Sequence, residues 1–385
     1  MGRFFAAVWN FAGKNEERTD GRSMAETERK TAKYRFLVDT IKEKIKSGAY
    51  GPGERMESEN RLSEEFGYSR QTVRQALSVL EREGLIERRR GSGTYISSEN
   101  RRPQRGNNVA IVTTYISDYI FPTIIRGIEE TLTNAGYSLT LGVTNNHVED
   151  ESRILQSLIN RKIDGVIVEG TKTAFPNPNV ELYRKLEKMG VPVVFFNGYY
   201  RDLLNAVYVV TDDKKAGRQA VNLLISKGCS RLGGVFKSDD MQGHGRYAGY
   251  SEGLIKNGCA IADDSVVWYT TAERSRLFRP DNRDYMFERL RDCDGIVCYN
   301  DQIAYGVIDL LTSRGVRVPE DVMVVGFDNS SISEYSPVKI TSFAHPKDEM
   351  GRIAANKLIN MLRSGDPEYP LIMDMPLCEK QSTNK

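Results

Sequence analysis

The chain of 385 residues has few of the side chains that build metal sites and disulfides. It contains three histidines and five cysteines. The cysteines are odd in number, and none of their spacings matches a metal-ligand motif. The sequence therefore predicts neither a structural metal site nor a disulfide framework, and it gives no sign of a cofactor. This cysteine usage fits a reducing cytoplasm.

Long hydrophobic runs are also missing. No stretch approaches the roughly 20 apolar residues that a membrane-crossing helix needs, so no membrane partner is expected. Residues 4–12 lean apolar behind Arg3, but this run contains Asn10 and is too short for the core of a signal peptide. We expect residues 1–31 to be a disordered leader or to include a mis-assigned start, with Met24 as the working initiator.

Signatures of catalysis do not stand out either. The segment Gly91 to Thr94 lacks the lysine and the spacing of a phosphate-binding loop, and no Ser/His/Asp or Cys/His grouping is evident. Glu169, Asp212 and Asp301 could serve as acid and base, but a sugar-binding site needs the same residue types without any reaction. An enzyme is therefore the less favoured interpretation.

Charge is divided unevenly along the chain. The net charge is +2, yet residues 33–105 hold 16 basic and 11 acidic residues, whereas residues 106–385 hold 32 basic and 36 acidic ones. A basic segment joined to a mildly acidic body is typical of a DNA-binding module attached to a small-molecule domain. The length allows two or three domains.

Residues 57–97 carry the pattern of two short helices followed by a hairpin. Leu62 and Phe66 are spaced to bury one face of the first helix, Gly67 ends it, and Ser69 is placed to cap the second. An apolar stripe marks the second helix: Val73, Ala76, Leu77 and Leu80. Apolar residues at helical spacing between positions 34 and 45 predict a further helix that packs behind this unit.

The first turns of the second helix should expose donors suited to phosphates and base edges. The basic hairpin has Gly91 and Gly93 at its tip, where glycine lets backbone approach a groove closely. The alternative interpretation is a small helical cap with a solvated arginine run. The candidate DNA-binding residues are Asn60, Ser69, Arg70, Gln71, Thr72, Arg74, Arg89, Arg90, Gly91, Ser92 and Gly93.

The motif order here is a helix, G-x-x-x-P-G-x-x-M/L-x-S/T-E-x-x-L, S-R-x-T-V-R-x-A-L and a G-x-G-T wing. Over about residues 33–97 this order resembles the GntR family of bacterial transcription regulators. The resemblance implies a winged helix-turn-helix in residues 32–97. Asn60 departs from the fatty-acid branch of that family, which has a basic residue in the second helix. The residues that the resemblance points to as operator contacts are Arg70, Thr72, Arg74, Arg90, Gly91 and Gly93.

A second, larger domain is expected at residues 109–380, after a polar linker at 98–108. Strand-like Val/Ile runs alternate with helical stretches, which predicts an α/β fold with parallel sheets, and the length favours two lobes with a cleft. The predicted strands are Val109–Thr114, Ser138–Thr144, Gly165–Glu169, Val191–Asn197, Val207–Thr211, Leu232–Phe236, Val266–Tyr269, Gly295–Tyr299 and Val322–Phe327.

Ligands of open α/β sheets bind beyond the carboxyl ends of the strands, so polar residues there are the candidate ligand contacts. Carboxylates, amides, a guanidinium and nearby aromatic rings are suited to the hydroxyls and C–H faces of a sugar. Helix capping is the alternative for each, and we favour it for Asp212, Asp213 and Asp301. The candidate sugar contacts are Tyr115, Tyr119, Glu169, Lys172, Asn197, Arg246, Asn300 and Asp328.

The motifs D-D-x-x-A-G, R-Y-A-G-Y, Y-N-D-Q-I-A-Y-G, V-V-G-F-D-N and T-S-F-A-H-P follow one another in this domain. Together they resemble the LacI/GalR effector domain, which is similar to periplasmic sugar-binding proteins, over roughly residues 107–380. The resemblance implies that Arg246, Asn300 and Asp328 contact an inducer. It places Asn197 at the lobe hinge, and it adds His345, at a glutamine-type position near the ligand, to the candidate sugar contacts.

Two departures from the LacI pattern, His345 and the pair Glu169 with Lys172, indicate a ligand unlike the usual hexosides. A GntR-type reader joined to a LacI-type sensor resembles the bacterial arabinose repressors. We therefore expect a cytoplasmic homodimer that binds double-stranded operator DNA and releases it on binding L-arabinose. Regulation by another sugar, activation instead of repression, and a sugar-transport binding protein are the alternatives.

Overall fold

The computed structural model describes Tyr34 and residues 36–45, 47–82, 84–89, 92–97, 107–117, 119–161 and 163–385. The chain divides into two compact units, Met1–Arg105 and Gly106–Lys385. The leader predicted at residues 1–31 lies outside the described residues, as do Arg90 and Gly91 of the predicted wing tip.

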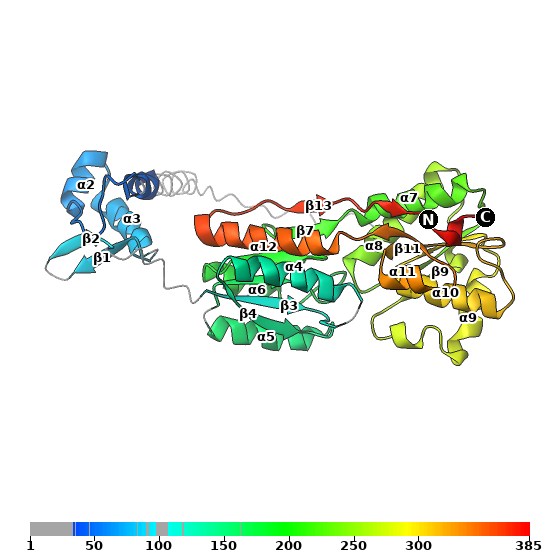
Figure 1. Cartoon of the computed structure of the whole chain (residues 1–385). Coiled ribbons are helices and arrows are strands. Elements are labelled where there is room, and N and C mark those ends of the chain that lie inside the picture. The colour runs from blue at the N-terminus through cyan, green and yellow to red at the C-terminus, as the bar shows by residue number, and fades with distance from the viewer. Residues whose placement is uncertain are drawn as a thin grey trace, which may run out of the picture. The chain divides into compact units, whose positions relative to one another are not determined.

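The first unit is the predicted winged helix-turn-helix (Figure 1). A helix over residues 36–45 precedes α2 (Glu59–Phe66) and α3 (Arg70–Arg82), and an antiparallel hairpin of β1 (Ile86–Arg89) and β2 (Gly93–Ile96) follows. All three helices and the hairpin contribute to one buried apolar cluster, which contains Leu37, Ile41, Leu62, Val73, Ala76, Leu77, Leu80, Ile86 and Ile96.

Local conformation and hydrogen bonds set the end of α2 and the start of α3, as the sequence predicts. Gly67 ends α2 with φ of +64°, a conformation that glycine adopts without steric cost. The Ser69 hydroxyl accepts a hydrogen bond of 3.3 Å from the backbone N–H of Thr72, so it caps α3. The turn between the helices is therefore defined by two residues in the sequence.

The wing has a third segment that the sequence did not reveal. The backbone N–H of Met56 donates to the Thr94 carbonyl at 2.9 Å, and that of Ile96 donates to the Glu54 carbonyl at 2.7 Å. These bonds pair residues 54–56 with β2 and fasten the hairpin to the rest of the unit.

The second unit contains two six-stranded sheets, each of which forms a lobe (Figure 1). In lobe 1 the strand order is β13-β7-β6-β5-β3-β4, and all the pairs are parallel. Its strands are β3 (Asn108–Thr113), β4 (Ser138–Val143), β5 (Gly165–Val168), β6 (Val193–Phe196), β7 (Val207–Thr211) and β13 (Leu371–Met373). Its helices are α4 (Phe121–Asn134), α5 (Val148–Asn160), α6 (Val180–Lys188) and α12 (Lys347–Ser364).

Lobe 2 has the strand order β14-β12-β11-β10-β8-β9, which is parallel except for β14. Its strands are β8 (Leu232–Lys237), β9 (Val266–Tyr269), β10 (Gly295–Cys298), β11 (Met323–Asp328), β12 (Thr341–Ala344) and β14 (Leu377–Cys378). Its α-helices are α7 (Asp213–Ser226), α8 (Met241–Lys256), α9 (Pro280–Leu290), α10 (Asp301–Ser313) and α11 (Ser331–Tyr335). Three short 3₁₀ turns complete it: η1 (Asp263–Ser265), η2 (Arg274–Arg276) and η3 (Gln381–Thr383).

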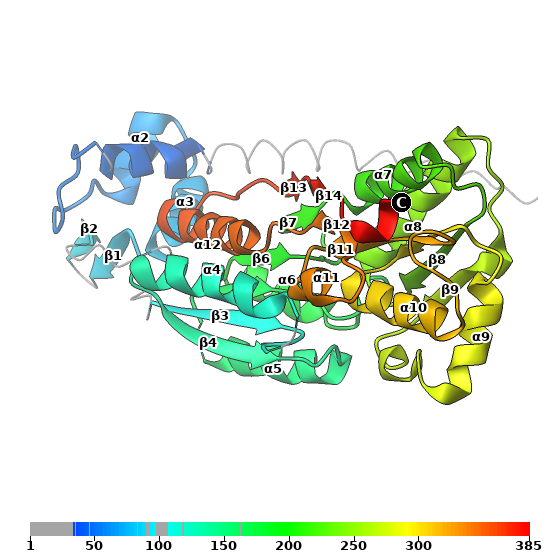
Figure 2. The ribbon, with the colours of Figure 1, turned by 45° about the vertical axis from the view of Figure 1, so that its right-hand side comes forward.

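Helices cover both faces of each sheet, as the continuous apolar runs predict. Val109 and Ile111 of β3 pack with α4 and α12, whereas Ala110 and Val112 pack with α5 and α6. Figure 2 shows α4 and α12 side by side on one face of this sheet and α5 on the other. Alternate residues of one strand thus belong to different apolar layers.

The chain passes between the lobes three times, from β7 to α7, from β12 to α12 and from β13 to β14. All nine predicted strands of this unit are present, with ends that differ by at most two residues. β6 starts at Val193 and not at Val191, since Pro192 has no N–H to donate to a neighbouring strand. The late strands β12, β13 and β14, of four, three and two residues, were not predicted.

Glycines allow α7 and α8 to pack with their backbones in close contact. A Cβ on Gly217 would lie 2.2 Å from the Arg246 carbonyl oxygen, and one on Gly249 would lie 2.0 Å from the Lys214 carbonyl oxygen. Backbone atoms cannot move aside as a flexible side chain can. The helix pair that carries Arg246 therefore depends on these two glycines.

Replacing Gly217 with alanine should force α7 and α8 apart. We expect Gly217→Ala to lower the free energy of unfolding by about 1–3 kcal/mol, measured by urea denaturation. Gln219→Ala, on the exposed face of the same helix, is the control and should change it by less than about 0.5 kcal/mol. Equal stability of the two variants would show that the close helix contact is not a constraint.

Candidate functional site

The start of α3 presents most of the predicted DNA-binding donors to solvent. Arg70, Gln71 and Arg74 are exposed, and the Arg74 Nε lies 2.7 Å from Glu59 Oε2 on α2. The prediction that Thr72 is an exposed donor is corrected. This residue is only 6% exposed, and its hydroxyl lies 2.9 Å from the Ser69 hydroxyl. Thr72 thus stabilises the start of the helix.

The described part of the wing is polar and compact. The Arg89 guanidinium lies over the Tyr95 ring at 4.6 Å, and the Tyr95 hydroxyl lies 2.7 Å from the Ser92 hydroxyl. Gly93 has φ of +118°, and a Cβ there would lie 2.9 Å from the Arg55 Nε. Glycine is favoured at this position for two reasons: its backbone conformation suits glycine, and Arg55 packs where a Cβ would lie.

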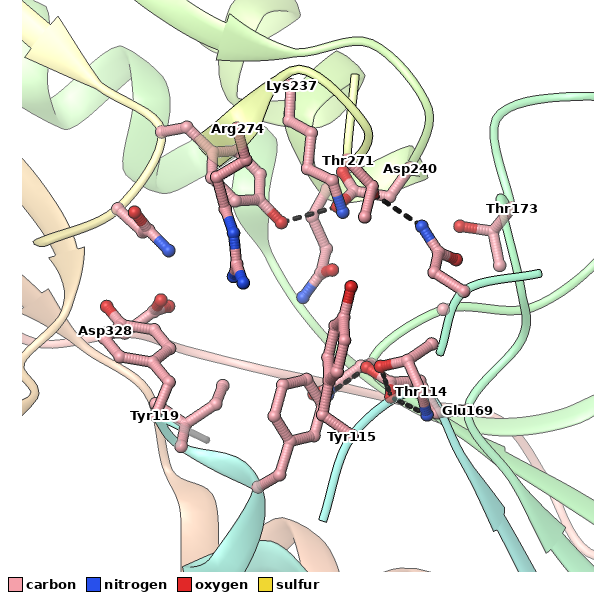
Figure 3. Close-up of a pocket in the computed structure, with 18 of the residues that line it drawn as sticks. Thr114, Tyr115, Tyr119, Glu169, Thr173, Lys237, Asp240, Thr271, Arg274 and Asp328 are labelled. Carbon is pink, nitrogen blue, oxygen red and sulfur yellow. Dashed lines mark hydrogen bonds and ion pairs between the residues drawn. The ribbon is translucent and has the colours of Figure 1, made fainter. Parts of the chain in front are cut away.

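A cavity between the two lobes contains most of the predicted sugar contacts. Figure 3 shows Tyr115 and Tyr119 of lobe 1 opposite Lys237 and Arg274 of lobe 2. The structure thus gathers side chains from the carboxyl ends of strands in both sheets, which is where α/β sheets bind ligands. The predicted residues that line the cavity are Tyr115, Tyr119, Glu169, Asn197, Arg246, Asn300 and Asp328.

Two predicted sugar contacts do not line the cavity. Lys172 has φ of +47°, and its backbone N–H donates a hydrogen bond to the cavity residue Asn146, at 2.9 Å from Oδ1. His345 lies behind Asn197, with its Nε2 at 3.0 Å from Asn197 Oδ1. The prediction of direct contacts by these side chains is therefore corrected, because neither side chain lines the cavity.

Arg246 forms the electrostatic centre of the lobe 2 wall. Its side chain is 1% exposed, its Nε lies 2.8 Å from Asp213 Oδ1, and its Nη2 lies 3.4 Å from Asp328 Oδ1. Its Nη1 also donates to the Tyr299 carbonyl. Burial lowers the pKa of Arg246, but the two carboxylates raise it by more, so the guanidinium stays charged.

The acidic residues beside the helix starts divide differently from the prediction. Asp212 caps α7 by accepting from the Lys215 N–H at 2.9 Å, as expected. Asp213 does not cap and instead binds Arg246, while burial raises its pKa to about 6. α10 is capped by Asn300, whose Oδ1 accepts from the Ile303 N–H at 3.1 Å. The side-chain oxygen of Asn300 therefore already accepts a hydrogen bond from the backbone of its own helix.

Asp301 is the other acidic residue whose predicted cap is not observed. Its carboxylate accepts from the Ser330 N–H at 2.7 Å and from the Ser342 hydroxyl at 2.6 Å. Burial, reinforced by the nearby Asp328, raises its pKa to about 7. Asp301 therefore ties α10 to the strand ends behind the cavity wall.

Several cavity residues were missed in the sequence, although the same rule could have found them. Lys237 ends β8 and Asp240 follows it, Asn146 follows β4, and Arg274 follows β9. The Lys237 Nζ lies 3.0 Å from Asp240 Oδ2. Burial alone would lower the pKa of Lys237, but Asp240 and Asp239 raise it above its ordinary value, so the lobe 2 wall holds a second buried cation.

The floor of the cavity in lobe 1 is built around Glu169. Its Oε1 accepts from Asn197 Nδ2 at 3.0 Å, and its Oε2 accepts from the Thr114 N–H at 2.9 Å and from the Thr114 hydroxyl. Burial raises the pKa of Glu169, while these donors oppose that effect. The carboxylate holds the ends of three neighbouring strands together.

The lobes also contact each other at the mouth of the cavity. Asn146 Nδ2 donates to the Thr271 hydroxyl at 2.6 Å, and the Met241 N–H donates to the Thr173 hydroxyl at 3.1 Å. Figure 3 shows Thr173 and Thr271 among the residues that line the cavity. These direct bonds join lobe 1 to lobe 2 beside the cavity.

Donors, acceptors and aromatic rings from both lobes therefore meet in one enclosed space, which is suited to a small polyhydroxylated ligand. Among the described residues, no group of three His, Cys, Asp or Glu side chains is arranged to hold a metal ion. In the same part of the chain, no helix combines the length and apolar character needed to cross a membrane.

Protonation of His345 should be linked to unfolding. Burial, then the charges of Lys347 and Arg246, lower its pKa from 6.5 to about 3. Between these values the unfolded chain binds a proton that the folded protein does not, so the free energy of unfolding falls as the pH falls through this window. His345→Gln removes the group and should lose about 2 kcal/mol less than the unsubstituted protein between pH 7.5 and pH 5 in urea denaturation. An identical loss in both proteins would contradict a neutral, buried His345, and exposed His147→Gln serves as the control.

Comparison with known proteins supports both units. Residues 33–96 match the family described as bacterial regulatory proteins, gntR family, and residues 221–383 match the periplasmic binding protein-like domain. The solved complex of the transcriptional regulator CelR with cellobiose is 23% identical, with a TM-score of 0.63, over 81% of this chain and 90% of that one. A LacI-type regulator from Alkaliphilus metalliredigens, complexed with D-xylulofuranose, is 23% identical with a TM-score of 0.61, over 73% of this chain and 100% of that one. These two likenesses establish the fold.

Two curated relatives span both units. The arabinose metabolism transcriptional repressor of Halalkalibacterium halodurans is 38% identical over 91% of this chain and 96% of that protein. The repressor of the same description from Geobacillus stearothermophilus is 36% identical over 93% of this chain and 99% of that protein. The chain therefore belongs to the GntR-type bacterial transcription regulators, in the group that includes the arabinose metabolism transcriptional repressors.

Proposed function

We propose that this protein is an L-arabinose-responsive repressor, which binds operator DNA through its winged helix-turn-helix and L-arabinose in the cavity between the lobes. The observation that carries the proposal is the gathering of buried cations, carboxylates and aromatic rings in the cleft of a chain that matches arabinose repressors along both units. Paired charges leave the cavity walls close to electrical balance, which suits a neutral sugar.

The sugar contacts proposed are those predicted residues that line the cavity, together with Lys237, Asp240 and Arg274. The sugar would touch both lobes and stabilise the closed arrangement. It can weaken DNA binding only by the difference between its affinities for the two protein states, typically about 1–3 kcal/mol. That difference is sufficient for derepression.

We propose that the protein binds operator DNA as a homodimer in the cytoplasm. A symmetric dimer places two reading helices on half-sites about one helical turn apart, or a multiple of that distance. The proposed contacts are Arg70, Gln71 and Arg74 on α3 together with the wing, while Ser69 and Thr72 support the start of the helix. No reaction is proposed, so added sugar should be recovered unchanged.

The sugar assignment is tested by titration. L-arabinose should lower operator affinity by about 5- to 150-fold at fixed salt, measured by fluorescence anisotropy with a labelled operator duplex. D-xylose and D-ribose are the comparison sugars and should have much weaker effects. An operator affinity that does not change with L-arabinose would remove the arabinose assignment, and a response to another pentose would replace it.

The DNA surface is tested by a pair of substitutions at the start of α3. Arg70→Ala should weaken operator binding by about 1–3 kcal/mol, because it removes an exposed charged donor. Thr72→Val keeps the shape of a buried side chain and should leave operator affinity within about twofold while lowering stability slightly. The reverse ranking of the two affinities would refute this surface. A fall of about one in the slope of log affinity against log salt would identify Arg70 as a phosphate contact.

A further inference from the structure

Hydrogen bonds connect the carboxyl ends of four strands beneath the cavity. His345 follows β12, Asn197 follows β6, Glu169 follows β5 and Thr114 follows β3. Each is bonded to the next in that order, at 3.0, 3.0 and 2.9 Å. We call these four residues the strand-end network. Three of them line the cavity, whereas His345 lies in the connection from β12 to α12 that joins the lobes.

The direction of each bond follows from chemistry. The Glu169 carboxylate accepts from the Thr114 N–H and from the Asn197 amide, so Asn197 presents its Nδ2 to Glu169 and its Oδ1 to His345. The His345 Nε2 must then carry the hydrogen. The low pKa of about 3 keeps the ring neutral, with the hydrogen on that nitrogen.

The bond from His345 fixes the orientation of the Asn197 amide. Asn197 is 2% exposed, so its Oδ1 cannot turn to bulk water if the donor is lost. Reorientation of the amide would take the Nδ2 donor away from Glu169. The other oxygen of Glu169 holds Thr114, which directly precedes the cavity residue Tyr115. A change at His345 therefore reaches the Thr114–Tyr115 segment through two intermediate side chains, Asn197 and Glu169.

The second nitrogen of the His345 ring, Nδ1, independently indicates that the bond to Asn197 is what the ring contributes. His345 is 4% exposed, and its Nδ1 has no hydrogen-bond partner among the described residues. A buried polar atom without a partner costs free energy. The single bond from Nε2 to Asn197 is thus the polar interaction that the ring provides at this position.

We propose that His345 is a positioning residue of the effector site, which keeps Asn197, Glu169 and the Thr114–Tyr115 segment in the arrangement that receives the sugar. This inference rests on the proposed function and deepens it. It assigns His345 to the support of the site, where the sequence indicated direct contact with the ligand.

Two substitutions separate the hydrogen bond from the volume of the side chain. In His345→Gln the amide nitrogen lies the same number of bonds from Cβ as Nε2 does, so it can donate to Asn197. His345→Leu fills a similar volume but has no donor. Hydrogen exchange of the Thr114 and Tyr115 amides, measured without sugar, and calorimetric titration with L-arabinose are the two readouts. The exposed His147→Leu is the matched control.

We expect His345→Leu to speed up exchange at these amides and to weaken L-arabinose binding about tenfold, since a buried carbonyl loses its donor. His345→Gln should restore both values close to those of the unsubstituted protein, which a purely space-filling role would not produce. The control should change neither.

The proposal is overturned if His345→Leu keeps the original exchange rates and sugar affinity, or if His345→Gln is as defective as His345→Leu. A separate outcome concerns the proposed function alone. If the unsubstituted protein does not bind L-arabinose, but His345→Leu speeds up exchange and His345→Gln restores it, the sugar assignment fails and the positioning role stands.

Discussion

The buried guanidinium of Arg246 is the interaction on which the effector unit depends. A buried charge is tolerated only when it is paired and hydrogen-bonded, and Asp213 and Asp328 supply both conditions from different elements. Asp213 starts α7 and Asp328 ends β11, so one side chain on α8 ties together three parts of lobe 2. The close packing of α7 against α8, through Gly217 and Gly249, brings these parts within reach.

The same compensation recurs around the cavity and defines what it can hold. Lys237 pairs with Asp240, and Glu169 accepts hydrogen bonds from Asn197 and Thr114. Because these charges are already compensated, a ligand does not need to bring a charge of its own. The remaining donors, acceptors and ring faces suit the hydroxyl and C–H groups of a sugar. Binding between two lobes also gives such a ligand a way to favour one arrangement of the protein over another.

The DNA-binding unit follows a simpler logic. Its core is local, its helices end at Gly67 and begin at Ser69, and the wing is fastened by backbone bonds from residues 54–56. At the start of α3, Arg70, Gln71 and Arg74 lie outside this core and are exposed. Thr72 at the same helix start is buried and bonded to Ser69, so it stabilises the unit.

The sequence by itself determined both folds and the region of the site, because helical periodicity, buried strand runs and polar residues at strand ends are local patterns. It placed Glu169 and Asp328 at the cavity for that reason, whereas Arg246, which lies within α8, was indicated by the resemblance of its motif to the LacI/GalR effector domain. Only the tertiary structure decided which neighbour does what: Asp212 caps a helix while the adjacent Asp213 binds Arg246, and His345 supports the cavity floor without lining it. The roles of Asp213 and His345 depend on partners 33 and 148 positions away in the chain, and local sequence patterns do not encode such distances.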